Sequence, residues 1–313
     1  MMPPPEDVSV ALPVGQAIER VKRVLFQPFD LGKWFAIGFC AWLANLGRGG
    51  FRGNYNFGPG HGGGMGQVRG WVEQARDYVT NNLIWILPLA AAVVLLGAAI
   101  WVLVIWLSSR GRFMFLHCVA FDKAEVAVPW GKLARAANSL FWFRLVVGLA
   151  GLAATLPLVA IMVITSWRMI ERRAPSVGGL IEVVGVGLLL LLVGAVFWVV
   201  AKLTTDFVVP IMFRRGGGCL PGWGVLLGLL AGNLGRFILY FLFQIVLSLA
   251  IGVLVLTAVL VTCCVFGCLA AIPYLGTVLL LPIFVFRRSY SVCYLAQYGG
   301  EYDVFRLTPG ESR

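Results

Sequence analysis

Residues 183–218 read VVGVGLLLLLVGAVFWVVAKLTTDFVVPIMFRRGGG. At 1.5 Å per residue, about 20 apolar residues cross the hydrocarbon core of a bilayer, and the run up to Ala201 supplies them. The apolar character nevertheless continues as far as Phe213. An apolar extension of this kind would face water unless another part of the chain covered it. The stretch therefore predicts a membrane helix that ends in a covered layer outside the hydrocarbon.

The composition of the whole chain also predicts a membrane protein. Of 313 residues, 60% are hydrophobic and 12% are charged, whereas a soluble domain carries about 25% charged residues. We expect an all-α fold, a polytopic membrane helical bundle of about six transmembrane helices. The apolar runs that would form them lie at about residues 31–46, 83–107, 140–166, 183–201, 236–262 and 269–286.

The distribution of basic residues predicts the orientation of the chain. The net charge is +11, and with the N-terminus inside, most lysines and arginines fall in cytoplasmic segments. MMPPPEDV has no recognisable cleavable signal, so the first span would direct insertion. We expect a multi-pass protein of the plasma or inner membrane with both termini in the cytoplasm. Its basic residues would anchor to the lipid bilayer, and no nucleic-acid partner is needed to explain them.

Three segments of the chain begin with the same short pattern, a proline followed within a few residues by a glycine. These are Pro13–Gly15, Pro129–Gly131 and Pro221–Gly224. Each opens a series of apolar residues spaced as on one face of a helix, and proline suits a helix start. The series are Val14, Ala17, Ile18, Val21, Val24 and Leu25; then Trp130, Leu133, Ala134, Ala137, Leu140 and Phe141; then Trp223, Leu226, Leu227, Leu230 and Leu234.

We interpret this pattern as three parallel repeats, each an amphipathic interfacial helix followed by two spans. The amphipathic helices would cover the apolar extensions of the second, fourth and sixth spans. All repeats would form one membrane domain, and the first would carry a glycine-rich outer loop at 48–67. The expected boundaries are a disordered N-terminus at 1–12, repeats at 13–122, 123–215 and 216–303, and a tail at 304–313.

The apolar extensions contain polar residues that are candidates for structural or functional sites. Aligned on Phe113, Phe207 and Tyr290, the extensions place Arg112 and Asp206 at equivalent positions. A base and an acid at equivalent positions of neighbouring repeats are able to attract each other across the bundle. We therefore hypothesise an ion pair between these two side chains.

Four further polar residues are candidates. Arg288 lies in the extension of the sixth span, and His117 lies among apolar residues in that of the second. We expect His117 to be a packing residue rather than a ligand or a base. Asp30 and Lys33 lie at the headgroup boundary of the first span, where an acid near a helix N-terminus is favourable.

We predict no catalytic, cofactor-binding or metal-binding residues, and hence no enzyme. The chain has two histidines, too few for the usual metal sites, and it lacks the common hydrolase and nucleotide-binding motifs. Cys263, Cys264 and Cys268 cluster, but small apolar packing is a better interpretation than a metal or redox site. The glycines in GPGHGG, within the loop at 48–67, follow no strand, which argues against a dinucleotide site.

Three short motifs resemble those of a known group of proteins. They are FQPFDLGKWF (Phe26–Phe35), DFVVPIM (Asp206–Met212) and YLAQYGGEY (Tyr294–Tyr302). The group consists of uncharacterised bacterial and archaeal polytopic membrane proteins, similar to the membrane domain attached to some glycerophosphodiester phosphodiesterases. The resemblance implies a polytopic membrane domain. The catalytic phosphodiesterase domain of such fusions has no counterpart in this sequence, so none of its active-site residues is carried over.

These observations leave more than one function open. The first hypothesis is a non-enzymatic scaffold whose cytoplasmic layer docks an unidentified membrane or cytoplasmic protein. The alternative is a transporter or channel for a small molecule or lipid, and an intramembrane enzyme is the third. A continuous polar cavity between the repeats would favour transport. A sealed apolar bundle with an exposed cytoplasmic patch would favour the scaffold.

Overall fold

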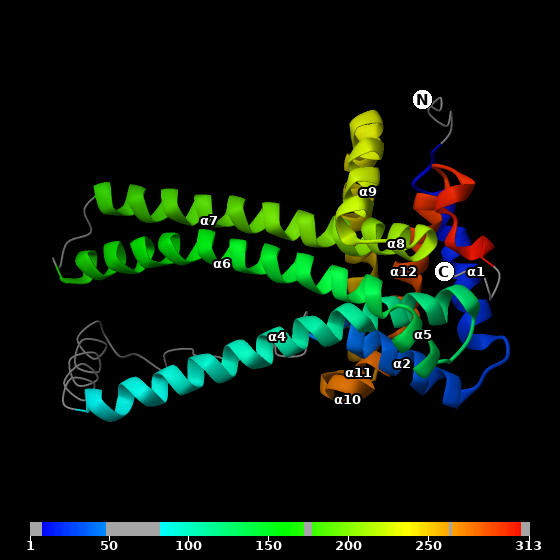
Figure 1. Ribbon diagram of the computed structural model, residues 1–313, viewed down its shortest axis with the longest axis horizontal. Coiled ribbons are helices and arrows are strands. Elements are labelled where there is room, and N and C mark those ends of the chain that lie inside the picture. The colour runs from blue at the N-terminus through cyan, green and yellow to red at the C-terminus, as the bar shows by residue number, and fades with distance from the viewer. Residues whose placement is uncertain (1–7, 48–81, 172–176, 263–264, 308–313) are drawn as a thin grey trace.

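The computed structural model describes residues 8–47, 82–171, 177–262 and 265–307. Within these ranges the chain is helical and contains no strand, so the predicted all-α class is confirmed (Figure 1). The predicted glycine-rich loop at 48–67, together with Cys263 and Cys264, lies outside the described residues. The α-helices are α1 (Leu12–Phe26), α2 (Leu31–Asn45), α4 (Leu83–Phe121), α5 (Ala127–Lys132), α6 (Ala134–Glu171), α7 (Val177–Leu203), α8 (Val209–Arg215), α9 (Cys219–Val261), α10 (Val265–Ala271), α11 (Pro273–Leu279) and α12 (Leu281–Ala296). A π-helical turn, η1 (Thr204–Val208), joins α7 to α8, and two 3-10 turns, η2 (Gly300–Tyr302) and η3 (Val304–Arg306), follow α12.

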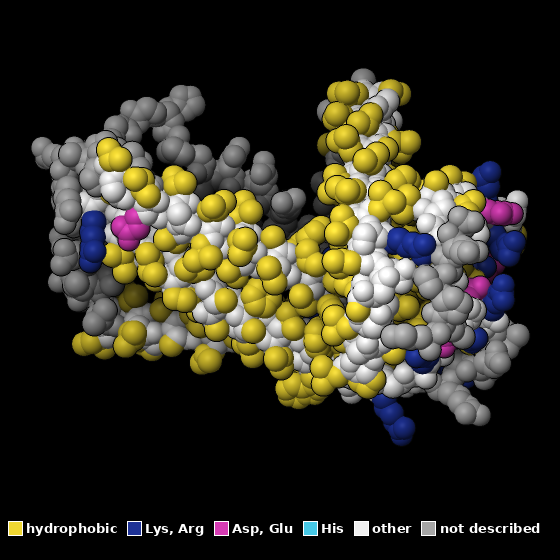
Figure 2. All heavy atoms as spheres, turned by 90° about the horizontal axis from the view of Figure 1, so that it is seen from above, with side chains coloured by type: hydrophobic (Ala, Val, Ile, Leu, Met, Phe, Trp, Pro, Cys, Tyr) yellow, Lys and Arg dark blue, Asp and Glu magenta, His cyan; other side chains and the backbone are white. Residues whose placement is uncertain are grey.

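Four helical stretches in the described part of the chain are long and apolar enough to cross a membrane. They are Ile84–Phe121, Ala134–Met169, Val177–Arg215 and Cys219–Val261, with hydropathies of 2.7, 2.4, 2.8 and 2.6 in their most apolar parts. In those parts no more than 6% of the residues are buried. Figure 2 shows hydrophobic side chains covering these projecting helices. Because exposing apolar surface to water is unfavourable by about 25 cal/mol per Å², the helices indicate association with a membrane.

The first and sixth predicted spans differ from the other four. Helix α2 has 15 residues, which at 1.5 Å per residue gives about 22 Å, less than the hydrocarbon thickness of about 30 Å. Helix α2 packs closely on α4. At their contact, Gly111 of α4 is so near to α2 that a Cβ atom on it would lie 2.5 Å from the backbone nitrogen of Ala44. The sixth predicted span, 269–286, is divided among α10, α11 and α12. Only four of the six predicted spans are therefore continuous helices of spanning length within the described residues.

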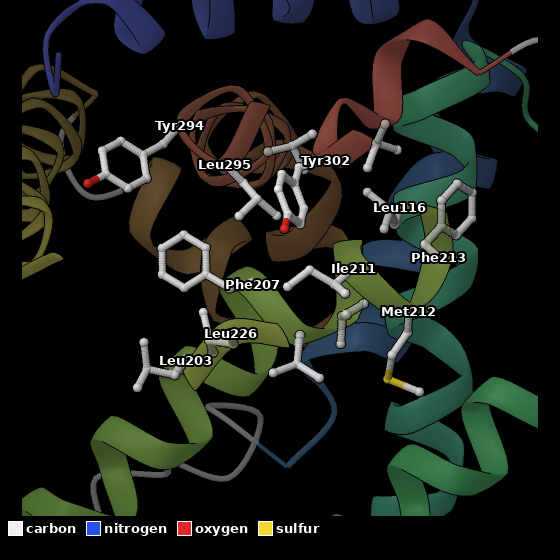
Figure 3. Close-up of a cluster of buried hydrophobic side chains, with 14 of the residues drawn as sticks. Leu116, Leu203, Phe207, Ile211, Met212, Phe213, Leu226, Tyr294, Leu295 and Tyr302 are labelled. Carbon is white, nitrogen blue, oxygen red and sulfur yellow. The ribbon is translucent and has the colours of Figure 1, made fainter. Parts of the chain in front are cut away.

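The hydrophobic core lies at one end of the molecule, where the long helices converge. Its residues include the apolar extensions predicted from the sequence, and Phe113, Phe207 and Tyr290 are each 0% exposed. Figure 3 shows Phe207 of η1, Ile211 of α8 and Leu295 of α12 gathered in one cluster. From this core, α4, α6 and α7 project in one direction and α9 projects in another (Figure 1). The end that carries the core is called the core end below.

Both ends of the described chain belong to the core end. The backbone N–H of Ser9 donates a 2.8 Å hydrogen bond to the side-chain oxygen of Gln297, and the Tyr290 hydroxyl donates to the carbonyl of Val10. These bonds hold the segment before α1 against α12. Within the N-terminal segment predicted to be disordered, Val8 and Val10 pack against the core, Ala11 and Leu12 are exposed, and residues 1–7 lie outside the described residues.

One pair of substitutions on α7 tests whether the core end carries the stability of the fold. Leu203 is 6% exposed and packs in the core, whereas Leu191 on the same helix is 69% exposed. We expect Leu203→Ala to lower the free energy of unfolding by about 2–5 kcal/mol, because it leaves a cavity. Leu191→Ala should change it by about 0.5 kcal/mol or less. Unfolding of the purified protein in a mild detergent measures both, and equal losses would contradict this location of the core.

Candidate functional site

A band of buried and half-buried polar side chains separates the core from the projecting helices. We call it the polar belt, and its members come from α4, α6, α7, η1, α9 and α12. Burial of such groups is tolerated only when they are hydrogen-bonded, so their partners define the site. The members are Ser108, Ser109, Arg112, Arg144, Lys202, Thr204, Thr205, Asp206, Tyr240 and Arg288.

The centre of the polar belt is the π-helical turn η1. The N–H of Val209 bonds to the carbonyl of Thr204, five residues back, instead of the α-helical partner four residues back. Pro210 follows immediately, and in a regular α-helix its ring would clash with the carbonyl of Asp206. The wider turn accommodates the proline without ending the helix. Such π-turns are frequent at functional sites.

Asp206 connects η1 to α7 and α9. Its carboxylate lies 2.7 Å from the Lys202 ammonium and accepts a 3.2 Å hydrogen bond from the Tyr240 hydroxyl. Gln244 in turn donates to that hydroxyl at 2.8 Å. Asp206 is 8% exposed, so its charge needs these contacts.

Thr205 connects η1 to α4 and α12. The Arg112 guanidinium, 5% exposed, donates a 2.8 Å hydrogen bond to the Thr205 hydroxyl. The Arg288 guanidinium, 8% exposed, donates a 2.6 Å bond to the Thr205 carbonyl. One hydrogen bond from Arg112 thus reaches Thr205, the residue next to its hypothesised partner Asp206.

Arg144 extends the polar belt onto α6. Its guanidinium donates to the Ser109 hydroxyl at 2.9 Å and, over longer distances, to the Ser108 hydroxyl and the Ile105 carbonyl. These acceptors lie on α4, so the arginine ties the two projecting helices together where they leave the core. Arg144 is not among the candidate residues predicted from the sequence. Arg144 is the one charged residue in the apolar run LFWFRLVV, and this feature of the sequence could have marked it as a candidate.

A cleft opens beside the polar belt, among α4, α6 and α7. Its volume is about 430 Å³, and it is partly open to the outside. The polar residues that line it are Arg112, Arg144 and Thr204, and its walls include Trp101, Phe143, Phe197 and other apolar residues. Pockets that hold small ligands have volumes of about 300–1,000 Å³ and combine apolar walls with a few polar groups.

The other three predicted polar residues lie away from this cleft. Asp30 caps α2, since its carboxylate accepts a 2.8 Å hydrogen bond from the N–H of Gly32. Lys33 forms a 2.8 Å salt bridge with Asp122, at the end of α4. His117 is 8% exposed, and its ring lies 4.8 Å from that of Phe121 and 6.3 Å from that of Phe213. The part of the chain that is described contains no group of three His, Cys, Asp or Glu side chains that could hold a metal ion.

A charge-removal series tests whether the Asp206 pair stabilises the polar belt. Asp206→Asn leaves the Lys202 ammonium without its counter-charge, and we expect a loss of about 2–3 kcal/mol in unfolding free energy. Lys202→Met combined with Asp206→Asn removes both charges and should lose less than Asp206→Asn alone. Both are measured by unfolding in detergent.

Glu301→Gln provides the control for this series, because it breaks a salt bridge with Arg215 in which the side chains are 50% and 37% exposed. An exposed pair contributes about 1 kcal/mol or less. If Asp206→Asn costs no more than Glu301→Gln, the Asp206 pair does not stabilise the belt.

Comparison with known proteins gives the family of the chain. No curated protein and no solved structure matches it. A family model described as a family of unknown function, DUF7544, matches residues 9–300. The match begins before α1 and ends in η2, so it includes the core, the polar belt and the cleft. The chain therefore belongs to this family of unknown function.

Proposed function

We propose that this protein is a non-enzymatic, multi-pass scaffold of the plasma or inner membrane that presents its core end to a protein partner in the cytoplasm or membrane. The observation that carries the proposal is the division of the molecule into two ends. The projecting helices expose apolar side chains along their length, whereas Lys, Arg, Asp and Glu gather mainly on the core end, with a few at the far tips of these helices (Figure 2). A bilayer around the helices leaves the core end in water, free to contact other molecules.

The charges support placing the core end in the cytoplasm. Exposed basic residues such as Lys22, Arg23 and Lys132 lie on the core end. Basic residues next to membrane helices favour the cytoplasmic side. Both termini would then be cytoplasmic, since the segments at 8–11 and 297–302 pack against each other or against the core.

Equivalent burial supports three repeats. Ala17, Leu133 and Leu226 occupy the same place after the Pro–Gly starts, and they are 0%, 9% and 0% exposed. The residues preceding the aligned core aromatics are also buried: Arg112, Asp206 and Ser289 are 5%, 8% and 0% exposed. Three divergent segments that bury the same positions are best explained by one repeated unit. The amphipathic helix of each unit packs on the apolar extension of another: α1 on α12, α5 on α4, and the start of α9 on η1 and α8.

Six membrane segments remain part of the proposal, four of them full-length and two short. In this arrangement α2 and α10–α12 enter the bilayer beside α4, with exposed apolar residues such as Phe39 and Leu275 facing lipid. Helix α9 leaves the core in a different direction from α4, α6 and α7. If all four cross one bilayer, α9 must tilt toward the other three, and the non-helical Asn233 (φ −142°, ψ 33°) marks a kink near its base.

The second candidate function is a transporter or channel for a small molecule or lipid. The cleft among α4, α6 and α7 favours it, because the cleft combines arginine side chains with apolar walls at the base of the membrane helices. A transport route would need this cleft to continue along the projecting helices, which a scaffold does not require.

Reporter fusions test the orientation. Green fluorescent protein fused after Arg313 should fluoresce, because it folds in the cytoplasm. Alkaline phosphatase inserted between Glu171 and Val177, or between Thr262 and Val265, should be active, because it matures outside. Active phosphatase at the C-terminus would contradict the orientation, and inactive phosphatase after Thr262 would contradict a crossing by α9.

Purification in nanodiscs separates the two candidate functions. We expect a protein partner to co-purify at a fixed ratio to this chain, identified by mass spectrometry and confirmed by reciprocal purification from the partner. Purified protein that lacks a partner and moves a solute or lipid across the membrane of a sealed vesicle would replace the scaffold with the transporter.

A further inference from the structure

We propose that the cleft among α4, α6 and α7 holds one acyl chain of a lipid from the leaflet next to the core end, bound through its hydrocarbon and not through the charge of its headgroup. The inference rests on the membrane insertion proposed above. It goes beyond the scaffold role, because a lipid chain held between these helices would fill the space between them in a scaffold or in a transporter.

The side chains that line the cleft follow the same order on all three helices. At the base, beside the core, they are Arg112 of α4, Arg144 of α6 and Thr204 of α7. Each of these polar side chains makes a hydrogen bond within the protein, so a ligand in the cleft need not bind them. Farther from the core the lining consists of apolar side chains and glycines: Trp101, Val104, Val147, Gly148, Gly151, Phe197 and Val200.

The length of the cleft is close to the thickness of one leaflet. On α6 the lining runs from Arg144 to Gly151, and on α4 it runs from Arg112 to Trp101. At 1.5 Å per residue these two segments are about 10 Å and about 16 Å long. One leaflet is half of the hydrocarbon core of about 30 Å, which gives about 15 Å. Because the cleft begins at the polar belt, it lies at the depth of the chains in the leaflet next to the core end.

The volume of the cleft suits a single chain. It is about 430 Å³. A methylene group is about the size of a water molecule, whose share of liquid volume is about 30 Å³, so the cleft holds on the order of ten methylenes. An α-helix with its side chains is about 10 Å across, and a 10 Å length of it would need roughly twice this volume. A helix of a partner protein is therefore too large for the cleft.

Two glycines of α6 shape the walls of the cleft. A Cβ atom at Gly148 would lie 3.0 Å from the Trp101 ring, and one at Gly151 would lie 3.5 Å from the Phe197 ring. Both rings pack on the backbone of α6 because no side chain stands between them and the helix. They form two aromatic walls beside the cleft. A leucine at either glycine would push a ring into the cleft and close it.

Lipid is the surrounding medium that reaches this cleft. The cleft is partly open to the outside, and in the most apolar parts of α4, α6 and α7 no more than 6% of the residues are buried. An empty cleft would deprive the lining side chains of van der Waals contacts, and water would leave their apolar surface hydrated. An acyl chain restores these contacts and requires no polar partner.

Photo-crosslinking of the wild-type protein tests the site directly. The full chain is reconstituted in nanodiscs of phosphatidylcholine with a photoactivatable group on one acyl chain, and mass spectrometry assigns the crosslinks to single residues. Bulk lipid reaches Val146 and Leu149 of α6, which are 61% and 50% exposed. We expect further crosslinks on Val147 and Gly151, which line the cleft. Crosslinks on Val146 and Leu149 alone would overturn the proposal.

Competition between unlabelled lipids tests whether the headgroup matters. Excess phosphatidylcholine and excess phosphatidylglycerol should suppress the crosslinks on Val147 and Gly151 to the same extent, because both supply the same chains. Inorganic phosphate should not suppress them. Suppression by phosphatidylglycerol alone, or by phosphate, would mean that charge controls binding, and the proposal would be wrong.

Two leucine variants form a matched pair. Gly151→Leu should reduce the crosslinks on Val147 about tenfold, the effect of excluding about two methylenes from the cleft. Gly194 is an exposed glycine of α7, where a Cβ atom would meet nothing within 4 Å in the described part of the chain. Gly194→Leu should therefore crosslink as the wild type does. Equal crosslinking of Val147 in the two variants contradicts a chain between these walls.

Crosslinks on Val146 serve as the internal standard, since bulk lipid produces them in every variant that lies in a bilayer. The reporter fusions described above show independently whether the protein is inserted. A correctly inserted wild-type protein without crosslinks on Val147 and Gly151 counts against the chain site alone and leaves the proposed function standing.

Discussion

The apolar segment that continues α7, made of η1 and α8, must be shielded from water because it lies beyond the length that a bilayer covers, and the rest of the structure follows from that constraint. Residues such as Phe207, Val208 and Ile211 are at most 2% exposed because α9, α12 and the turns after α12 surround them. Removing a phenylalanine-sized side chain from such a core costs about 3–5 kcal/mol. The long helices bury few of their own residues, so they form little core. Burial at the core end must therefore offset the conformational entropy lost when the chain is ordered.

The same constraint explains why the polar belt is buried. A helix that continues from the lipid into a protein core passes through a boundary layer between the two. Buried polar groups in that layer must form hydrogen bonds within the protein. The turn η1 supplies several of them. Its wider winding before Pro210 presents Asp206 to Lys202 and Tyr240, and it presents Thr205 to Arg112 and Arg288. One turn of chain thus connects four helices through charged or polar contacts.

The cleft is a consequence of how the three projecting helices diverge. They are held together at their base by Arg144 and by the polar belt, and small residues on α6 leave space between them just above it. Arg112 and Arg144 line that space together with apolar side chains such as Trp101.

The sequence by itself determined the all-α class and the burial of the segments beyond the hydrocarbon length, and four of its six predicted spans are long apolar helices within the described residues. The length of the run at 31–46, 16 residues, already made the first span short. These properties depend on the length and period of apolar runs, which are local and can be read along the chain. The sequence also drew attention to Asp206 and Arg112 as charges beside apolar segments. Tertiary structure alone decided that the last predicted span is divided among three helices and that Arg112 donates a hydrogen bond to Thr205. Those outcomes depend on which residues from different helices contact each other, such as Gly111 and Ala44. The spacing of apolar residues within one segment does not reveal such contacts.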